Sequence, residues 1–108
     1  MKKKIEPSFK KEKMAKTNLF ETERFFLDVY GLEPGQSQSA HAHEGGDKVY
    51  VILEGEGQAT VGGETRPVSA GDAIHAPAGV LHALENPGPD RLVALAFMTP
   101  HPSFGKKK

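Results

Sequence analysis

The sequence contains no cysteine, and its longest uninterrupted apolar run covers only residues 92–98. Without thiols the chain forms no disulfides and no thiolate metal sites, so any metal ion must be held by His, Asp or Glu. A helix that spans a bilayer needs about 20 apolar residues, so no membrane span is expected. The lysine-rich start lacks the apolar stretch of a secretory signal. These absences favour a cytoplasmic protein.

Charge is unevenly distributed along the chain, although 14 basic and 14 acidic residues give a formal net charge of zero. Residues 1–16 carry seven lysines against two glutamates, and residues 105–108 carry three lysines. Residues 17–104 hold four basic and twelve acidic residues, a net charge near −8. A body of this sign does not suit nucleic acid, whose phosphates bind basic surfaces. We interpret residues 1–20 and 102–108 as basic tails that flank a single domain at 21–101.

Short β-rich runs separated by glycine and proline begin at Arg24 and recur about every 8–12 residues, a pattern typical of an all-β sandwich or barrel. We expect strands at residues 24–32, 37–43, 48–54, 57–61, 64–69, 73–76, 81–85 and 91–99. Pro67 lacks an N–H and belongs on an edge strand or at a bulge. The lysine-rich residues 1–20 predict a poorly ordered or weakly helical segment.

His41 and His43 stand two residues apart on an expected strand, where alternate side chains point to the same face. Their Cα atoms would lie about 6.5 Å apart, so both imidazoles can reach one ion at about 2.0–2.1 Å. Farther along, Pro77 and Gly79 form a rigid turn just before His82. An antiparallel barrel can bring His82 opposite the first two histidines.

The joint spacing of these residues resembles the two motifs of small single-domain cupins of the cupin-2 type. The first motif is Gly-x5-His-x-His-x(3 or 4)-Glu-x6-Gly, and it is matched here by Gly35, His41, His43 and Gly55, with Lys48 where Glu is expected. The second motif is Gly-x5-Pro-x-Gly-x2-His-x3-Asn, and it is complete in Gly71, Pro77, Gly79, His82 and Asn86.

The resemblance implies an all-β, antiparallel jelly-roll barrel with His41, His43 and His82 as metal ligands at its mouth. The metal would be a divalent transition ion, and Fe, Zn, Ni, Mn and Cu are all suited to imidazole. The resemblance also implies a homodimer, often formed through exchange or pairing of N-terminal strands. No nucleic-acid or membrane partner is expected.

Lys48 is the consequential departure from the family pattern, in which the Glu commonly supplies a fourth ligand. A protonated amine about 4 Å from a divalent ion is repelled by roughly 8 kcal/mol at an effective dielectric near 20. Lys48 therefore swings away, loses its proton, or excludes the ion. Asp47 and Glu44 are alternative fourth ligands. For Lys48 we favour a surface ion pair at the barrel rim over a role in orienting a substrate carboxylate.

Three residues are candidate catalytic groups: Lys48, Tyr50 and His75. Tyr50 shares strand parity with Lys48 and is expected to line the interior together with Ile74 and Phe97, as a core residue or as a hydrogen-bond donor to substrate. His75 would serve as a general base if it points inward, whereas an outward position at the rim is the more frequent case.

These features leave three hypotheses for function. The first is metal-dependent, dioxygenase-like oxidation of a small chelating molecule such as a thiol, catechol or diketone. The alternative is a non-enzymatic module that binds or senses a small ligand, which is favoured by the lack of an identifiable general base. The third is a sugar isomerase or epimerase, a class that generally needs a His–Asp pair which the sequence does not locate.

Overall fold

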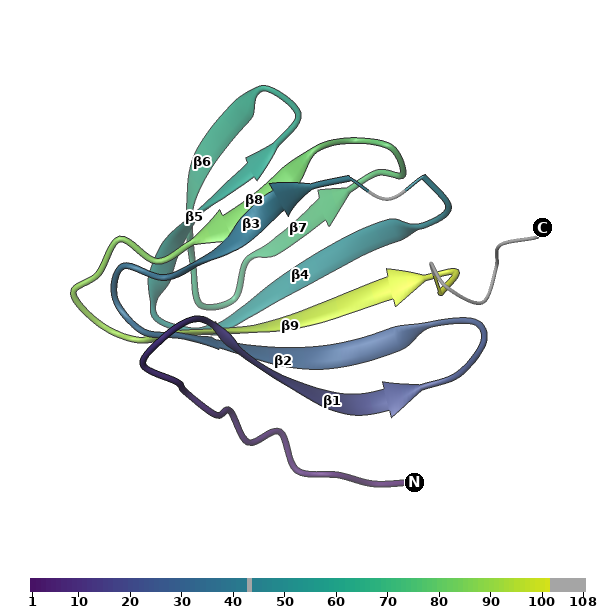
Figure 1. Cartoon of the computed structure of the whole chain (residues 1–108), viewed down its shortest axis with the longest axis horizontal. Coiled ribbons are helices and arrows are strands. Elements are labelled where there is room, and N and C mark those ends of the chain that lie inside the picture. The colour runs from purple at the N-terminus through teal and green to yellow at the C-terminus, as the bar shows by residue number, and fades with distance from the viewer. Residues whose placement is uncertain (43, 102–108) are drawn as a thin grey trace.

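The computed structural model describes residues 1–42 and 44–101, including all side chains except those of Ala40 and His41. Within these residues, antiparallel strands form two facing sheets (Figure 1). Sheet A has five strands in the order β1-β2-β9-β4-β7, and sheet B has four in the order β3-β8-β5-β6. The predicted all-β jelly-roll fold is confirmed. No helix occurs in the described parts of the chain, and hence none that could cross a membrane.

The strand bounds follow the glycine and proline turns. Sheet A comprises β1 (Ala15–Glu21), β2 (Phe26–Leu32), β9 (Leu92–Thr99), β4 (Asp47–Glu54) and β7 (Ala73–Ala76). Sheet B comprises β3 (Ser37–His41), β8 (His82–Glu85), β5 (Glu56–Val61) and β6 (Glu64–Ser69). From β2 onward every strand lies within two residues of its predicted range. Pro67 lies on β6, which is an edge strand as predicted.

β1 is the element that we did not predict, because it lies largely within the segment expected to be a weakly helical or poorly ordered tail. It pairs antiparallel with β2, and the described residues before it contain no helix. Ala15 and Leu19 are buried, whereas the intervening Lys16 and Asn18 are exposed. This period of two is that of a strand. The lysines around it lowered the average hydrophobicity and hid the pattern.

The main core fills the space between the two sheets. Its fully or nearly buried members are Tyr30, Leu32, Tyr50, Ile52, Ala59, Val68, Leu84, Leu92, Ala94 and Ala96. In sheet A, Ala94 is the register partner of Tyr30 and Ala96 is the partner of Tyr50. Two small residues on the central strand therefore leave room for two large rings.

Strand parity decides which side chains of sheet A enter this core. Lys48 and Tyr50 are at most 2% exposed, as their shared parity predicted. The prediction that Phe97 lines the interior is wrong. Its neighbours Ala96 and Met98 are fully buried, so Phe97 lies on the outer face of the sheet, where its ring is 5.5 Å from the ring of Phe25.

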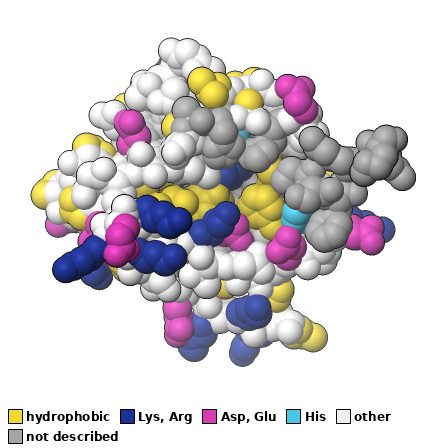
Figure 2. Space-filling model, in the orientation of Figure 1, with side chains coloured by type: hydrophobic (Ala, Val, Ile, Leu, Met, Phe, Trp, Pro, Cys, Tyr) yellow, Lys and Arg dark blue, Asp and Glu magenta, His cyan; other side chains and the backbone are white. Residues whose placement is uncertain are grey.

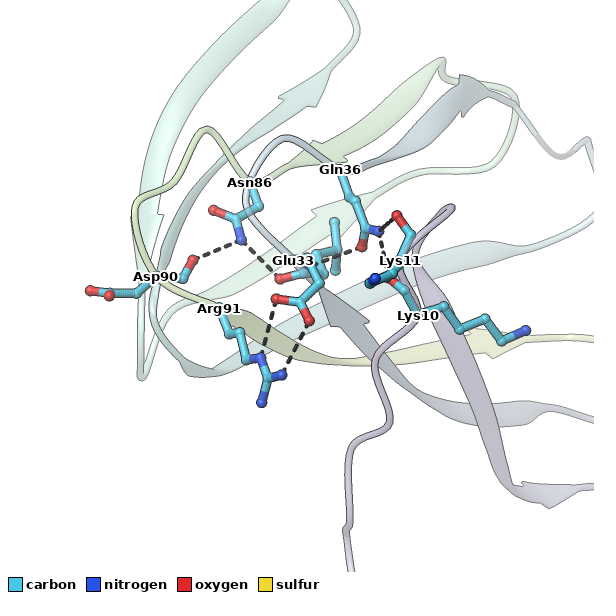
Figure 3. A network of polar contacts seen from close by, with 8 residues as sticks. Lys10, Lys11, Glu33, Gln36, Asn86, Asp90 and Arg91 are labelled. Atoms are coloured by element: carbon cyan, nitrogen blue, oxygen red, sulfur yellow. Dashed lines mark hydrogen bonds and ion pairs between the residues drawn. The ribbon is translucent and has the colours of Figure 1, made fainter.

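One end of the barrel is tied together by Asn86, which is 1% exposed (Figure 3). Its side-chain nitrogen donates to the carbonyl oxygens of Leu32 at 2.9 Å and Asp90 at 2.8 Å. Its side-chain oxygen accepts from the N–H of Gly88 at 2.9 Å. Both atoms of the amide are engaged with backbone, so Asn86 has the structural role that the sequence predicted.

Candidate functional site

His82 begins β8, at the end of the strand opposite Asn86, and its side chain is buried. Its Nδ1 atom lies 3.0 Å from the carbonyl oxygen of Val80. A carbonyl only accepts, so Nδ1 carries the hydrogen, and in the neutral ring the buried Nε2 atom carries the lone pair. Metal-binding histidines commonly have their second ring nitrogen fixed in this way. The tautomer of His82 thus suits binding through Nε2.

The turn before His82 sets where its ring lies. Gly79 has φ +80°, and the N–H of Val80 donates to the carbonyl of Pro77 at 3.1 Å. A residue with a Cβ is destabilised by about 1–2 kcal/mol in this left-handed conformation, so glycine is the suitable residue. The Pro77–Gly79 motif therefore acts on His82 through the Val80 carbonyl.

Asp47 connects this turn to β4. Its Oδ1 accepts from the N–H of Ala78 at 2.9 Å, and its Oδ2 lies 3.0 Å from Nε2 of His75. The hydrogen bond from His75, followed by that from Ala78, lowers the pKa of Asp47. Both carboxylate oxygens are thus engaged. His75 takes an outward position with 57% of its side chain exposed, and it forms the His–Asp pair that the sequence did not locate.

The three predicted metal ligands fall only partly within the described structure. The register places His41 directly opposite His82 in the β3–β8 ladder, and opposed positions share one face of an antiparallel sheet. The side chain of His41 and all of His43 lie outside the described residues. Among the side chains that are described, no three His, Asp or Glu gather closely enough to hold a metal. Glu44 is exposed, with its carboxylate beside Gly79.

Lys48 lies inside the barrel, so the predicted ion pair at the rim is wrong. Its Nζ donates to the Tyr30 hydroxyl at 2.8 Å and lies 5.1 and 5.2 Å from the ring centroids of Tyr30 and Tyr50. The alternation of β4 directs position 48 inward, and the two rings stabilise the cation there. Burial lowers the pKa of Lys48 to about 8; the charge of Lys16 adds to this shift and that of Asp28 opposes it.

Gln38 joins the two tyrosines into one network. Its Nε2 donates to the Tyr30 hydroxyl at 2.9 Å, and its Oε1 accepts from the Tyr50 hydroxyl. Burial raises the pKa of both phenols, which therefore stay neutral. The ring of Tyr50 meets that of His82 edge-on, with centroids 6.1 Å apart. A continuous chain of contacts thus runs from Lys48 to His82.

Tyr30 and Gln38 are the members of this network that we did not single out from the sequence. Tyr30 lies on β2 and Gln38 on β3, so the two belong to different sheets. Strand parity could have identified each as inward-facing. Their contact depends on the packing of one sheet against the other, which no local pattern encodes.

Comparisons with known proteins agree with this architecture. Residues 28–98 match the family of the cupin domain. The oxalate-binding protein of Thermotoga maritima is 42% identical over 67 residues, which are 62% of this chain and 55% of that protein. The chain thus spans little more than half of that relative.

Solved structures show the same fold over most of the chain. The TT1209 protein of Thermus thermophilus aligns with a TM-score of 0.85 and 43% identity, covering 88% of this chain and 90% of that one. A predicted oxalate decarboxylase from Thermotoga maritima aligns with a TM-score of 0.78 and 30% identity, covering 82% and 81%. With the family match spanning well over half of its residues, this chain belongs to the cupin family.

Proposed function

We propose that the protein binds a small carboxylate-bearing, chelating molecule at the mouth of its barrel, next to a divalent transition metal held by His41, His43 and His82. The observation that carries this proposal is the buried Lys48 amine at one end of the contact chain that leads to His82. An ammonium group near neutral imidazoles attracts an anion. The relatives named for oxalate support a small dicarboxylate as the ligand class.

The donor set supports a three-histidine site without a carboxylate ligand from the protein. Both oxygens of Asp47 are engaged with Ala78 and His75. Neutral imidazoles suit Fe, Zn, Ni, Mn and Cu, and the bound ion would supply Lewis acidity and open coordination positions. The single hydrogen bond from His82 to Val80 is the feature of the described residues that fits this group.

Lys48 in place of glutamate changes the charge that a ligand must neutralise. Three neutral histidines and one glutamate would leave a divalent ion with one net positive charge. With a protonated Lys48 the same site carries three, so we expect it to favour a dianion over a neutral ligand. Lys48 and Tyr50 would bind and orient the anionic group, while the apolar barrel interior excludes water.

The experiment is elemental analysis of the purified protein after expression with added metals, combined with titration of oxalate. We expect one transition ion per chain in the wild type and loss of both metal and oxalate binding in His82→Ala. The matched control is His75→Ala, which removes an exposed imidazole. A protein that binds no metal when metals are supplied, or a His82→Ala variant that keeps its metal, contradicts the proposal.

A dioxygenase-like reaction would be the enzymatic use of the same site. The test is oxygen consumption by the metal-loaded protein with a panel of thiols, catechols and diketones. Turnover that depends on both His82 and the metal would make the protein an enzyme. Metal-dependent binding of oxalate without turnover would make it a binding or sensing module.

We also propose a homodimer that forms through the outer face of sheet A. This face presents partly exposed apolar side chains from two adjacent strands: Val49, Val51, Leu53, Leu95 and Phe97. Val51→Lys should produce a monomer in sedimentation experiments. Leu81→Lys, at a residue 50% exposed elsewhere, should not change the assembly. A wild-type protein that is monomeric at micromolar concentration contradicts this proposal.

A further inference from the structure

A cavity of about 390 Å³ lies on the flank of the barrel between the N-terminal segment and the edge strand β3. We call it the lysine groove, and it is lined by Lys10, Lys13, Met14, Lys16, Ser37, Gln38 and Ser39. On the face shown in Figure 2, basic side chains gather beside a hollow that exposes apolar atoms. We propose that the lysine groove binds a small anion carrying two or more negative charges, such as a phosphate monoester or a polycarboxylate.

The backbone that carries the lysines is held in place on the barrel. Gln36 donates from its side chain to the carbonyl oxygens of Lys10 at 2.8 Å and Lys11 at 3.3 Å (Figure 3). Just before them, the ring of Phe9 packs under the guanidinium of Arg91, 4.1 Å from its centroid. Directly after the lysine run, the chain enters β1 at Ala15, which is 2% exposed. The lysine run is therefore anchored at both ends, so less conformational entropy is lost on binding.

The floor of the lysine groove leads to the buried network. Gln38, which lines the groove, holds Tyr30 and Tyr50 through its amide. Lys16 is the register partner of Tyr30 and lies on the inner side of sheet A. Its charge also reaches Lys48 behind the tyrosines. An anion in the groove would therefore meet lysines on the outside and a fourth cation behind the floor.

Opposing charge around the groove is limited. Asp28 lies near Lys16 and Lys48, but it is buried and accepts a hydrogen bond from Asn18 at 2.8 Å. Glu12 belongs to the same segment and is exposed. The lining itself contains three lysines and no acidic residue. The local excess of positive charge stands out against a domain whose body is acidic.

Size and chemistry point to a small ligand rather than a polymer. The volume lies at the lower end of the roughly 300–1,000 Å³ usual for small-molecule sites. Lysine ammonium groups act as point charges that bind phosphate or carboxylate without strict geometry. Met14 gives one wall that can accept a short carbon skeleton. The site differs from the proposed metal site and does not depend on it.

The test is a titration of the full-length ¹⁵N-labelled protein with inorganic phosphate and with citrate, at constant ionic strength set with chloride. We expect saturable shifts of the amide signals of Ser37, Gln38 and Ser39. The double variant Lys13→Gln/Lys16→Gln should weaken binding at least tenfold. The control Lys2→Gln/Lys4→Gln removes the same charge outside the groove and should change affinity less than twofold.

Three outcomes would overturn the proposal. The first is the absence of saturable shifts at residues 37–39 with both anions. The second is an equal loss of affinity in the two double variants, which would reassign the lysines to diffuse attraction, as would tight oligonucleotide binding that both variants weaken alike. The third is loss of these shifts in His82→Ala, which would move the anion to the barrel mouth. Retained shifts in His82→Ala support the groove even where the metal proposal fails.

Discussion

Nζ of Lys48 and the hydroxyl oxygen of Tyr30 lie 2.8 Å apart inside the barrel, where two tyrosine rings cover the ammonium group. A hydrogen bond and two ring faces offset only part of the free energy that burying a charge costs. The remaining cost appears as the lowered pKa of Lys48, about 8 against an ordinary 10.5. The fold thus retains an amine that is easier to deprotonate than any solvated lysine.

This cost makes folding stability depend on alkaline pH. Between pH 8 and 10.5 the unfolded chain keeps a proton on Lys48 that the folded chain has released, so raising the pH favours the folded state. We expect the free energy of unfolding of the wild type to rise relative to Lys48→Met across this window, by up to about 1.4 kcal/mol per pH unit. Urea denaturation of both proteins from pH 7 to pH 10 measures the difference. A difference that stays constant contradicts the buried position.

The Asp47 contacts predict that this residue positions His82 without touching the metal. Asp47→Asn removes the acceptor that ties Ala78 to His75, so the turn before His82 loosens. We expect metal affinity to fall about tenfold, as for other groups that orient metal ligands. Asp72→Asn is the control, because Asp72 accepts from the N–H of Ser69 in a turn away from His82. Competition with a chelator gives both affinities, and equal values for the two variants would refute the role.

Gly79→Ala tests the strained turn directly. At φ +80° a methyl group costs about 1–2 kcal/mol, and we expect thermal unfolding to show a loss of that size. Gly45→Ala is the control, because Gly45 has no atom within 4 Å of its Cβ position and no positive φ. Its effect should stay within about 0.5 kcal/mol of zero. A Gly79→Ala variant as stable as the wild type would show that this turn adapts.

Much of this fold can be predicted from the sequence, because glycine and proline mark the ends of nearly every strand. β1 escaped prediction, since Lys16 and the lysines before it outweigh the alternating Ala15 and Leu19 in any average. The position of Lys48 could be inferred from parity with Tyr50. The expectation that a charged group stays at the surface led us to the wrong place.

The candidate site was less predictable than the strands. His82 and its turn follow from one contiguous motif, so local spacing was sufficient. The partners of Lys48 come from β2 and β3, and Asp47 meets His75 across the β4–β7 edge. Such contacts depend on the register between strands far apart in the chain, which a single sequence does not state.

Asn86 predicts a large stability effect at the other end of the barrel. Asn86→Ala leaves two carbonyls and one N–H without their partner in a buried place. Each unsatisfied group costs about 1–3 kcal/mol, so we expect a loss of at least about 3 kcal/mol in urea denaturation. Asn18→Ala removes an exposed amide with a single side-chain partner, Asp28, and should cost about 1 kcal/mol or less. Equal losses would contradict the special place of Asn86.

The two tyrosines have a practical consequence for work in solution. The chain has no tryptophan and only two tyrosines, and both belong to the network around Lys48. Its near-ultraviolet emission therefore originates almost entirely in the centre of the barrel, with no background from the surface. The unlabelled protein carries its own optical reporter of whatever enters or disturbs that interior.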